Sequence, residues 1–192
     1  REAERRLLPL AADRGIAVTR GDSGASLSVD GSPVVTAEDR AATELIETAV
    51  LCNDAELEDV EAGVDAAGDP LEIALLRLGR QLGMERGDLL QRLPEVAQES
   101  FDPETQMMAT VHETDDGFRI AVKGAPEAVL AASDSERGES GRRALDEARR
   151  RSWVERNREM AESGLRVIAI AGRQAEAADE PPYRGLTLLG LV

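Results

Sequence analysis

Lys123 is the single lysine of this chain, and the residues around it have types and spacing that suit ligand binding. It lies in Phe118-Arg-Ile-Ala-Val-Lys-Gly-Ala-Pro-Glu127, whose alternation predicts a strand with the lysine opposite the large apolar side chains. Lysine is a compact charge on an apolar stem and tolerates narrow, partly dry pockets. Gly124 lets a ligand approach the backbone, and Pro126 suits the first turn of a helix. The pattern predicts a ligand-binding corner; the alternative is a surface lysine before an ordinary turn.

Several other chemistries lack the residues that they need. A Walker-type phosphate loop has glycine before its lysine, but here Val122 precedes Lys123. His112 is the only histidine and Cys52 the only cysteine, so neither a zinc site nor a Ser-His-Asp triad is supported. We therefore predict no metal site and no catalytic residue, and we interpret His112 as an ordinary strand residue.

The composition also restricts the class of partner. With 38 acidic and 23 basic residues the net charge is −15, which argues against nucleic acid and against an anionic membrane surface. The arginines of residues 142–158 are interleaved with Asp and Glu, a pattern typical of a solvated helix face. No apolar run approaches the roughly 20 residues of a spanning helix, so we expect the chain not to be membrane-inserted. Hydrophobic residues make up 42%, enough for a globular core.

The elements that must position Lys123 follow from hydrophobic periodicity and turn signals. They predict an α+β fold with a mostly antiparallel β-sheet flanked by helices. The predicted strands are 16–20, 25–29, 96–101, 106–114, 118–123, 165–171 and 186–192, with 165–171 central in the sheet. The predicted helices are 36–51, 70–82, 87–93, 126–132 and 142–163. The acidic stretch 53–68 is predicted to be a surface loop or a weak strand, and 133–141 a polar loop. The clearest helix start is Asp69-Pro-Leu-Glu72, with a capping aspartate and the spacing of a capping box.

Four short segments, in this order and spacing, resemble the nucleotide-binding (N) domain of P-type cation-transporting ATPases. They are Gly68-Asp-Pro-Leu-Glu-Ile-Ala-Leu75, Phe101-Asp-Pro-Glu-Thr-Gln-Met-Met-Ala109, Lys123-Gly-Ala-Pro-Glu127 and Gly164-Leu-Arg-Val-Ile-Ala-Ile-Ala171. Leu51-Cys-Asn-Asp54 and Leu188-Leu-Gly-Leu-Val192 match the same family, and the resemblance covers the chain from about residue 45 onward. Lys-Gly-Ala-Pro-Glu is similar to the calcium, sodium-potassium and magnesium-like branches; the heavy-metal branch would have His-Pro, but Glu113 follows His112.

The resemblance implies a set of ATP-binding residues. Phe101 would stack on adenine, and Glu72 would lie near its amino group. Lys123 and Gly124, with the adjacent Ala125, would line the floor of the adenine pocket. Met108 is a further candidate for lining it, and Arg166 would reach the phosphates. Each residue also has a structural alternative: helix capping for Glu72, core packing for Phe101 and Met108, and pairing with an acidic neighbour for Arg166.

One position departs from the family pattern. The family usually has a lysine five residues after the phenylalanine, but this chain has Gln106 there, and Pro103 removes a second possible phosphate contact. A neutral amide can hydrogen-bond but adds no charge toward a triphosphate. The alternative function is therefore an N-domain-like interaction or regulatory module with weak or lost nucleotide binding.

The resemblance also predicts how the domain would work in a larger protein. We expect residues 1–192 to be an N-domain fragment, as the start at Arg1 suggests, with 186–192 beginning the strand back to a phosphorylation domain. The family's phosphorylated aspartate lies in Asp-Lys-Thr-Gly-Thr, which needs a lysine other than Lys123. The fragment would bind ATP without hydrolysing it, with Mg²⁺ accompanying the nucleotide in the full-length pump. Its partners would be the phosphorylation and actuator domains of the same parent chain, an integral membrane protein of which this would be a cytoplasmic domain; the transported ion is left open.

Overall fold

The computed structural model describes residues 18–19, 26–27, 40–57, 68–138 and 141–192, and the fold is given for these residues. The helices are α1 (Arg40–Leu51), α2 (Pro70–Gln81), α3 (Arg86–Arg92), α4 (Pro126–Ala132) and α5 (Glu147–Glu162). The strands are β1 (Val18–Thr19), β2 (Ser26–Leu27), β3 (Glu95–Asp102), β4 (Met107–Thr114), β5 (Gly117–Gly124), β6 (Ser133–Gly138), β7 (Gly141–Ala144), β8 (Ala169–Ala175) and β9 (Leu186–Leu191).

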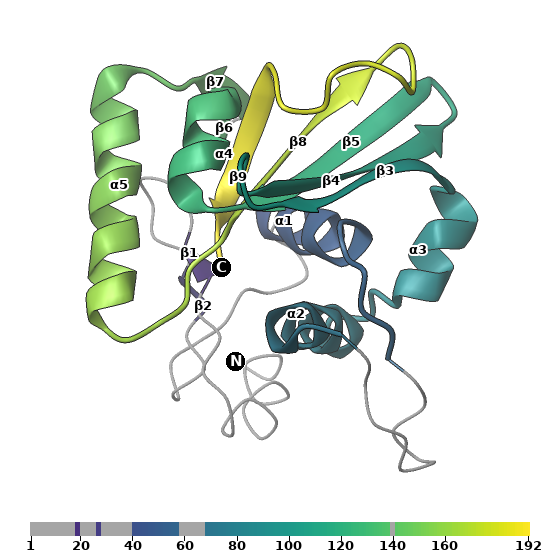
Figure 1. Cartoon of the computed structure of the whole chain (residues 1–192), viewed down its shortest axis with the longest axis horizontal. Helices are drawn as coiled ribbons and strands as arrows, with labels where there is room; N and C mark the ends of the chain where they lie inside the picture. The colour runs from purple at the N-terminus through teal and green to yellow at the C-terminus, as the bar shows by residue number, and fades with distance from the viewer. Residues whose placement is uncertain (1–17, 20–25, 28–39, 58–67, 139–140) are drawn as a thin grey trace.

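The strands form one sheet in the order β2-β1-β9-β8-β5-β4-β3 (Figure 1). β6 pairs with β9 beside β1, and β7 extends the sheet from β6. Among the described strands the β6–β9 pairing is parallel and the others are antiparallel. The predicted α+β class with a mostly antiparallel sheet is confirmed, and β8 is central as predicted.

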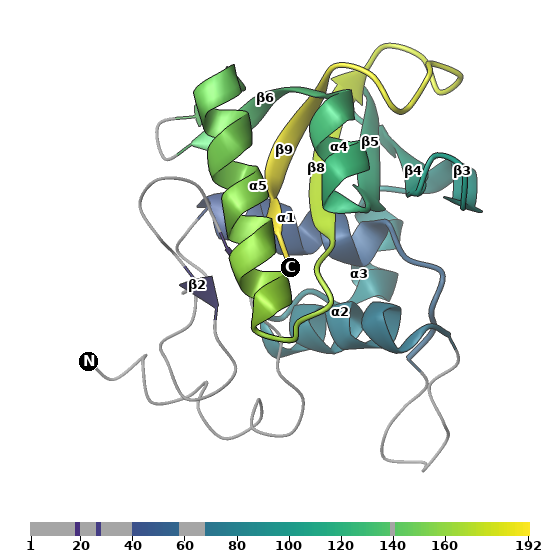
Figure 2. The ribbon, with the colours of Figure 1, turned by 60° about the vertical axis from the view of Figure 1, so that its left-hand side comes forward.

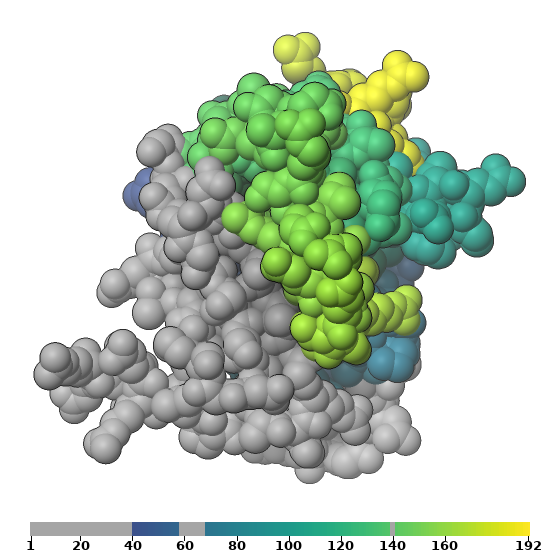
Figure 3. Space-filling view, turned by 90° about the vertical axis from the view of Figure 1, so that its left-hand side faces the viewer, coloured from purple at the N-terminus to yellow at the C-terminus, as the bar shows by residue number. Residues whose placement is uncertain are grey.

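Helices cover both faces of the sheet (Figures 1 and 2). On one face α1, α2 and α3 pack against Met108, Ala121 and Ile170. On the other face α4 and α5 pack against Ile120, Val122 and Ala171, and α5 forms the outer surface on that side (Figure 3). Because successive strand residues point to opposite faces, the side chains of β5 and β8 alternate between the core under α1–α3 and the core under α4 and α5.

Residues 133–141 are not the polar loop that the sequence predicts, because β6 and the start of β7 lie there. Glu136 on β6 is buried, yet its carboxylate accepts hydrogen bonds from Arg143 Nε at 2.6 Å, Arg149 Nη1 at 2.9 Å and Trp153 Nε1. These partners satisfy a charge that would otherwise exclude the segment from the interior. β6 is polar in sequence and is covered by side chains from α5, so it lacks the apolar alternation by which a strand can be predicted.

Two predicted boundaries are also wrong. The helix predicted from residue 142 begins at Glu147, because Asp146 caps it by accepting the Arg149 N–H at 2.9 Å. The strand predicted over 165–171 is β8, displaced to 169–175, because its pairing with β5 runs on to Phe118 and Ala175.

Other predictions agree with the structure or cannot be compared with it. Pro70 opens α2, Pro126 opens α4, and β4 and β5 form the predicted hairpin. Asn53 and Ala55 are buried, so the predicted loop after α1 begins inside the core. The predicted helix start at 36–39, residues 58–67, and most of the two predicted N-terminal strands lie outside the described residues.

His112 is buried on β4 beneath α3. Its Nδ1 lies 3.1 Å from the Leu93 carbonyl oxygen and its Nε2 lies 2.8 Å from Thr110 Oγ1. Since a carbonyl only accepts, Nδ1 carries the proton of the neutral ring. Burial, reinforced by the nearby Arg119 and Arg86, lowers the pKa of His112 from 6.5 to about 4.

This buried histidine predicts acid sensitivity. Between about pH 6.5 and pH 4 the unfolded chain takes up a proton at His112 that the folded chain excludes, so the free energy of unfolding falls as pH falls. The loss attributable to His112 is at most about 3 kcal/mol. Urea unfolding of the wild type and of His112→Gln at about pH 6.5 and pH 4 gives the stability that each protein loses between these pH values. The contribution of His112 is the loss in the wild type minus the loss in His112→Gln. Equal losses in both proteins contradict the assignment.

Candidate functional site

The first turn of α2 meets the end of β5 through an ion pair. Asp69 caps the helix by accepting the Leu71 N–H at 2.8 Å, and Glu72 follows in the first turn. Lys123 Nζ donates to Glu72 Oε1, and their side chains are only 10% and 13% exposed. Lys123 therefore lies on the face predicted for it, in a partly dry place where each charge needs the other.

Phe101 lies at the same end of the sheet. Asp102 pairs with Met107, and Met107 pairs in turn with Gly124, next to Lys123. Phe101 precedes Asp102 on the edge strand β3 and is 58% exposed. An exposed aromatic ring is notable in a chain with two phenylalanines, one tyrosine and one tryptophan. Its exposure excludes the core-packing alternative and leaves one apolar face open to a ligand.

The β3–β4 turn is joined to the segment after Lys123 through the backbone. The Ala125 N–H donates to the Gln106 carbonyl oxygen at 3.0 Å. A Cβ atom on Gly124 would lie 2.4 Å from that oxygen, so this position requires glycine because of the close approach. Gln106, predicted as the first residue of a strand, lies in the turn with a φ of 57° and an exposed side chain.

Arg166 and Met108 occupy contrasting environments. The side chain of Arg166 is 75% exposed, and its Nη1 lies 3.9 Å from Asp69 Oδ2 at the start of α2. It precedes β8 and does not lie within an apolar strand. Met108 is buried in the core between the sheet and α1–α3, where it packs. The structure thus brings Arg166 to the helix end that carries Glu72 and places Met108 beneath the surface.

Two residues that were not predicted as site residues lie directly behind this site. Cys52 Sγ donates to the Met108 carbonyl oxygen at 3.5 Å, and burial raises the pKa of the thiol to about 11 although the charge of Lys123 opposes the rise. Asn53 is buried and donates from Nδ2 to the Glu72 carbonyl oxygen at 3.1 Å. The only sequence signal for them was Leu51-Cys-Asn-Asp54, which entered solely through the family resemblance.

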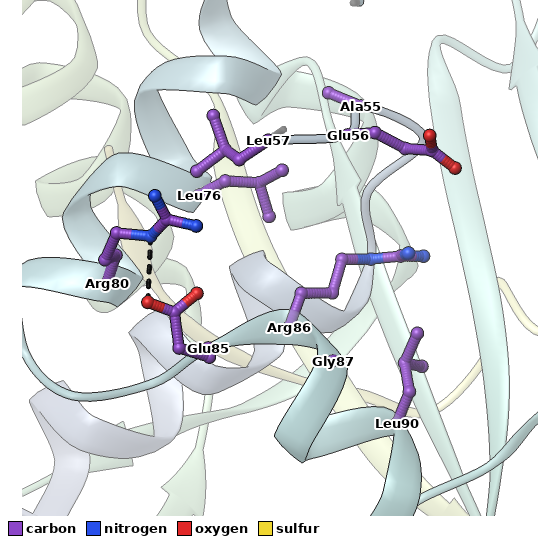
Figure 4. Close-up of a pocket in the computed structure, with 9 residues that line it drawn as sticks. All are labelled: Ala55, Glu56, Leu57, Leu76, Arg80, Glu85, Arg86, Gly87 and Leu90. Carbon is purple, nitrogen blue, oxygen red and sulfur yellow. Dashed lines mark ion pairs between the residues drawn. The ribbon is translucent and has the colours of Figure 1, made fainter. Parts of the chain in front are cut away.

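A separate pocket of about 250 Å³ lies between α2, α3 and the chain after α1 (Figure 4). The positive charges of its two arginines are balanced by carboxylates: Arg80 Nε lies 2.8 Å from Glu85 Oε1, and Arg86 Nη2 lies 3.3 Å from Glu95 Oε2. No predicted site residue lines this pocket, whose lining is Ala55, Glu56, Leu57, Leu76, Arg80, Glu85, Arg86, Gly87 and Leu90.

In the described part of the chain, no helix is both long and apolar enough to cross a membrane. Nowhere among the same residues do three or more His, Cys, Asp or Glu side chains gather in a way that could hold a metal ion.

Comparison with known proteins gives consistent matches. The sequence profile described as "P-type ATPase, cytoplasmic domain N" matches residues 41–192. The chain is 33% identical over 177 residues to the cation-transporting ATPase pma1 of Synechocystis, covering 89% of this chain and 18% of that protein. It is 33% identical over 152 residues to calcium-transporting ATPase 1 of Bacillus cereus (77% and 17%). It is 31% identical over 137 residues to the sodium/potassium exporting P-type ATPase cta3 of Schizosaccharomyces pombe (70% and 13%).

The buried ion pair predicts a strongly non-additive pair of substitutions. Glu72→Leu leaves the Lys123 ammonium without its partner and should lower the free energy of unfolding by about 3–5 kcal/mol. The double variant Glu72→Leu/Lys123→Met should recover to within about 1 kcal/mol of wild type, because apolar groups then replace both charges. Urea unfolding measures both.

The control is Glu85→Leu, which breaks the Arg80–Glu85 ion pair, whose side chains are more exposed than those of Lys123 and Glu72. This variant should lower the free energy of unfolding by under about 1 kcal/mol. If Glu72→Leu costs as little as this control, the Lys123–Glu72 pair is not held in a dry environment.

Proposed function

The chain belongs to the family of the cytoplasmic N domain of P-type ATPases, and on that premise we propose that it binds ATP beside Lys123 and Glu72. The observation that carries the proposal is the buried Lys123–Glu72 pair at the same end of the sheet as an exposed Phe101. Nucleotide bases need one aromatic or apolar face together with a few fixed polar groups at the edge. These three residues supply both.

The ion pair leaves bonding capacity for a base. An ammonium has three N–H donors and a carboxylate has two acceptor oxygens, whereas the pair itself uses one of each. Glu72 can accept from the adenine amino group while Lys123 donates to a ring nitrogen. The base need not break the pair, so Lys123 is not left buried without a counter-charge.

The phosphates would lie toward Arg166. Its guanidinium is exposed and its ion pair with Asp69 is long, so a phosphate can displace that carboxylate at small cost. Gln106 projects from a turn that the Ala125 N–H holds against β5, and it can donate a neutral hydrogen bond. The phosphate end of the site therefore depends more on Arg166 here than in family members that have a lysine at the position of Gln106.

In the intact protein, we propose, this domain presents the γ-phosphate of ATP to an aspartate of a separate phosphorylation domain. The actuator and phosphorylation domains would be its partners, and Mg²⁺ would neutralise phosphate charge when bound with the nucleotide. The chain spans under a fifth of the length of the relatives compared above. The isolated chain would bind ATP without hydrolysing it, since its only lysine is Lys123 and the phosphorylation motif needs one of its own.

Phe101→Ala should weaken ATP binding about fivefold to 150-fold, because stacking on a base is worth about 1–3 kcal/mol. Isothermal titration calorimetry of the 192-residue chain measures the Kd. Val96→Ala is the matched control, since Val96 is the other exposed large hydrophobic residue described on β3, at 46% exposure. An unchanged Kd in Phe101→Ala contradicts the stacking role, and no saturable binding by wild type favours an interaction module instead.

Gln106→Lys should strengthen ATP binding about fivefold, because a charged donor to a phosphate is worth about 1 kcal/mol more than a neutral one. The gain should shrink as salt rises from 0.05 to about 0.5 M, because the group is exposed. Calorimetry at both salt concentrations tests this expectation. A gain that does not depend on salt, or no gain, would show that the phosphates do not lie near this turn.

A further inference from the structure

We infer that Asn53 is a positioning residue of this site, which holds the first turn of α2 so that Glu72 faces Lys123. The significance of the inference for nucleotide binding rests on the proposed function. The mechanical part, the link from Asn53 to the ion pair, can be tested without any nucleotide.

Asn53 uses both ends of its amide. It is fully buried directly after α1, its Nδ2 donates to the Glu72 carbonyl oxygen at 3.1 Å, and its Oδ1 accepts the Ala55 N–H at 2.9 Å. The first bond reaches the backbone of the residue whose carboxylate binds Lys123. The second bond fixes the turn from which the amide projects. Asn53 therefore holds Glu72 from its backbone side while Lys123 holds the same residue by its carboxylate.

The same turn contacts the start of α2 and the sheet at other points. A Cβ on Gly68 would lie 2.5 Å from Ala55 Cβ, so the chain before Asp69 packs directly on this turn. Cys52 donates to the backbone of Met108, which pairs with Lys123 across β4 and β5. The 52–55 turn thus contacts α2 directly, through Asn53, and contacts β5 through Met108, its pairing partner on β4.

The donor end of the amide is the part that can be removed selectively. Asn53→Asp keeps the shape and the acceptor toward Ala55 but places a carboxylate oxygen against the Glu72 carbonyl, and two acceptors cannot bond. Asn53→Ser carries no charge and is too short to make both bonds. If both variants give the same effect, that effect comes from loss of the amide donor and not from the charge that aspartate adds.

The single lysine makes a direct experiment possible. Labelling the chain with ¹³C,¹⁵N-lysine yields signals from Lys123 alone, so the side-chain shifts report on the ion pair without assignment. In both Asn53 variants these shifts should move toward those of lysine in an unstructured peptide, and the Kd for ATP should rise about tenfold. Val129→Ala, a cavity in the opposite core on α4, is the control: it should lower stability while leaving the lysine shifts and the Kd unchanged.

The outcomes are distinguishable. Unchanged lysine shifts in a folded Asn53→Asp or Asn53→Ser protein overturn the inference, whatever happens to ATP binding. Moved shifts with a weaker Kd support it, provided that Val129→Ala moves neither. Moved shifts in a chain whose wild type does not bind ATP support the positioning of Glu72 and overturn the proposed function. If Asn53→Asp does not fold, Asn53→Ser decides.

Discussion

The charge of Lys123 imposes the constraint on which this end of the molecule depends. The charge of a lysine whose side chain is only 10% exposed must have a partner, and the partner comes from α2 rather than from the sheet. The need to compensate the charge fixes α2 against β5 at a defined point. Asp69, the cap of the same helix, is thereby brought within reach of Arg166. The need of the buried Lys123 ammonium for a counter-charge thus brings together the groups that we propose bind ATP.

Close backbone approaches give the site its rigid support. Gly124 touches the Gln106 carbonyl, and Gly79 of α2 approaches Val50 of α1 so closely that a Cβ there would lie 2.4 Å from Val50 Cγ2. Interiors packed in this way move as units. Phe101 and Arg166 are exposed at the edge of that support. Under the proposed function, this arrangement would hold the base firmly and leave the phosphate end open to another domain.

Part of the candidate site could be predicted because the relevant signals are local. The corner after Lys123 and the start of α2 were visible as strand alternation, Gly, Pro and a capping aspartate, and the structure has both. Arg166 was predicted inside a strand because residues 165–171 are apolar, yet β8 starts at Ala169, where the ladder with β5 begins. Cys52 and Asn53 were missed as site residues because their role consists of contacts to segments distant in sequence.

The sequence alone determined the fold class, the β4–β5 hairpin, the starts of α2 and α4, and the family, since turn residues, caps and motifs act within a few positions. Only the tertiary structure decided which charges are buried together. Glu72 and Lys123 are 51 residues apart, and Glu136 is buried on a strand of polar sequence because arginines and a tryptophan from other segments enclose it. A charge can be buried only where packing supplies its partners. Those partners are distant in sequence, so the periodicity of the chain does not predict them.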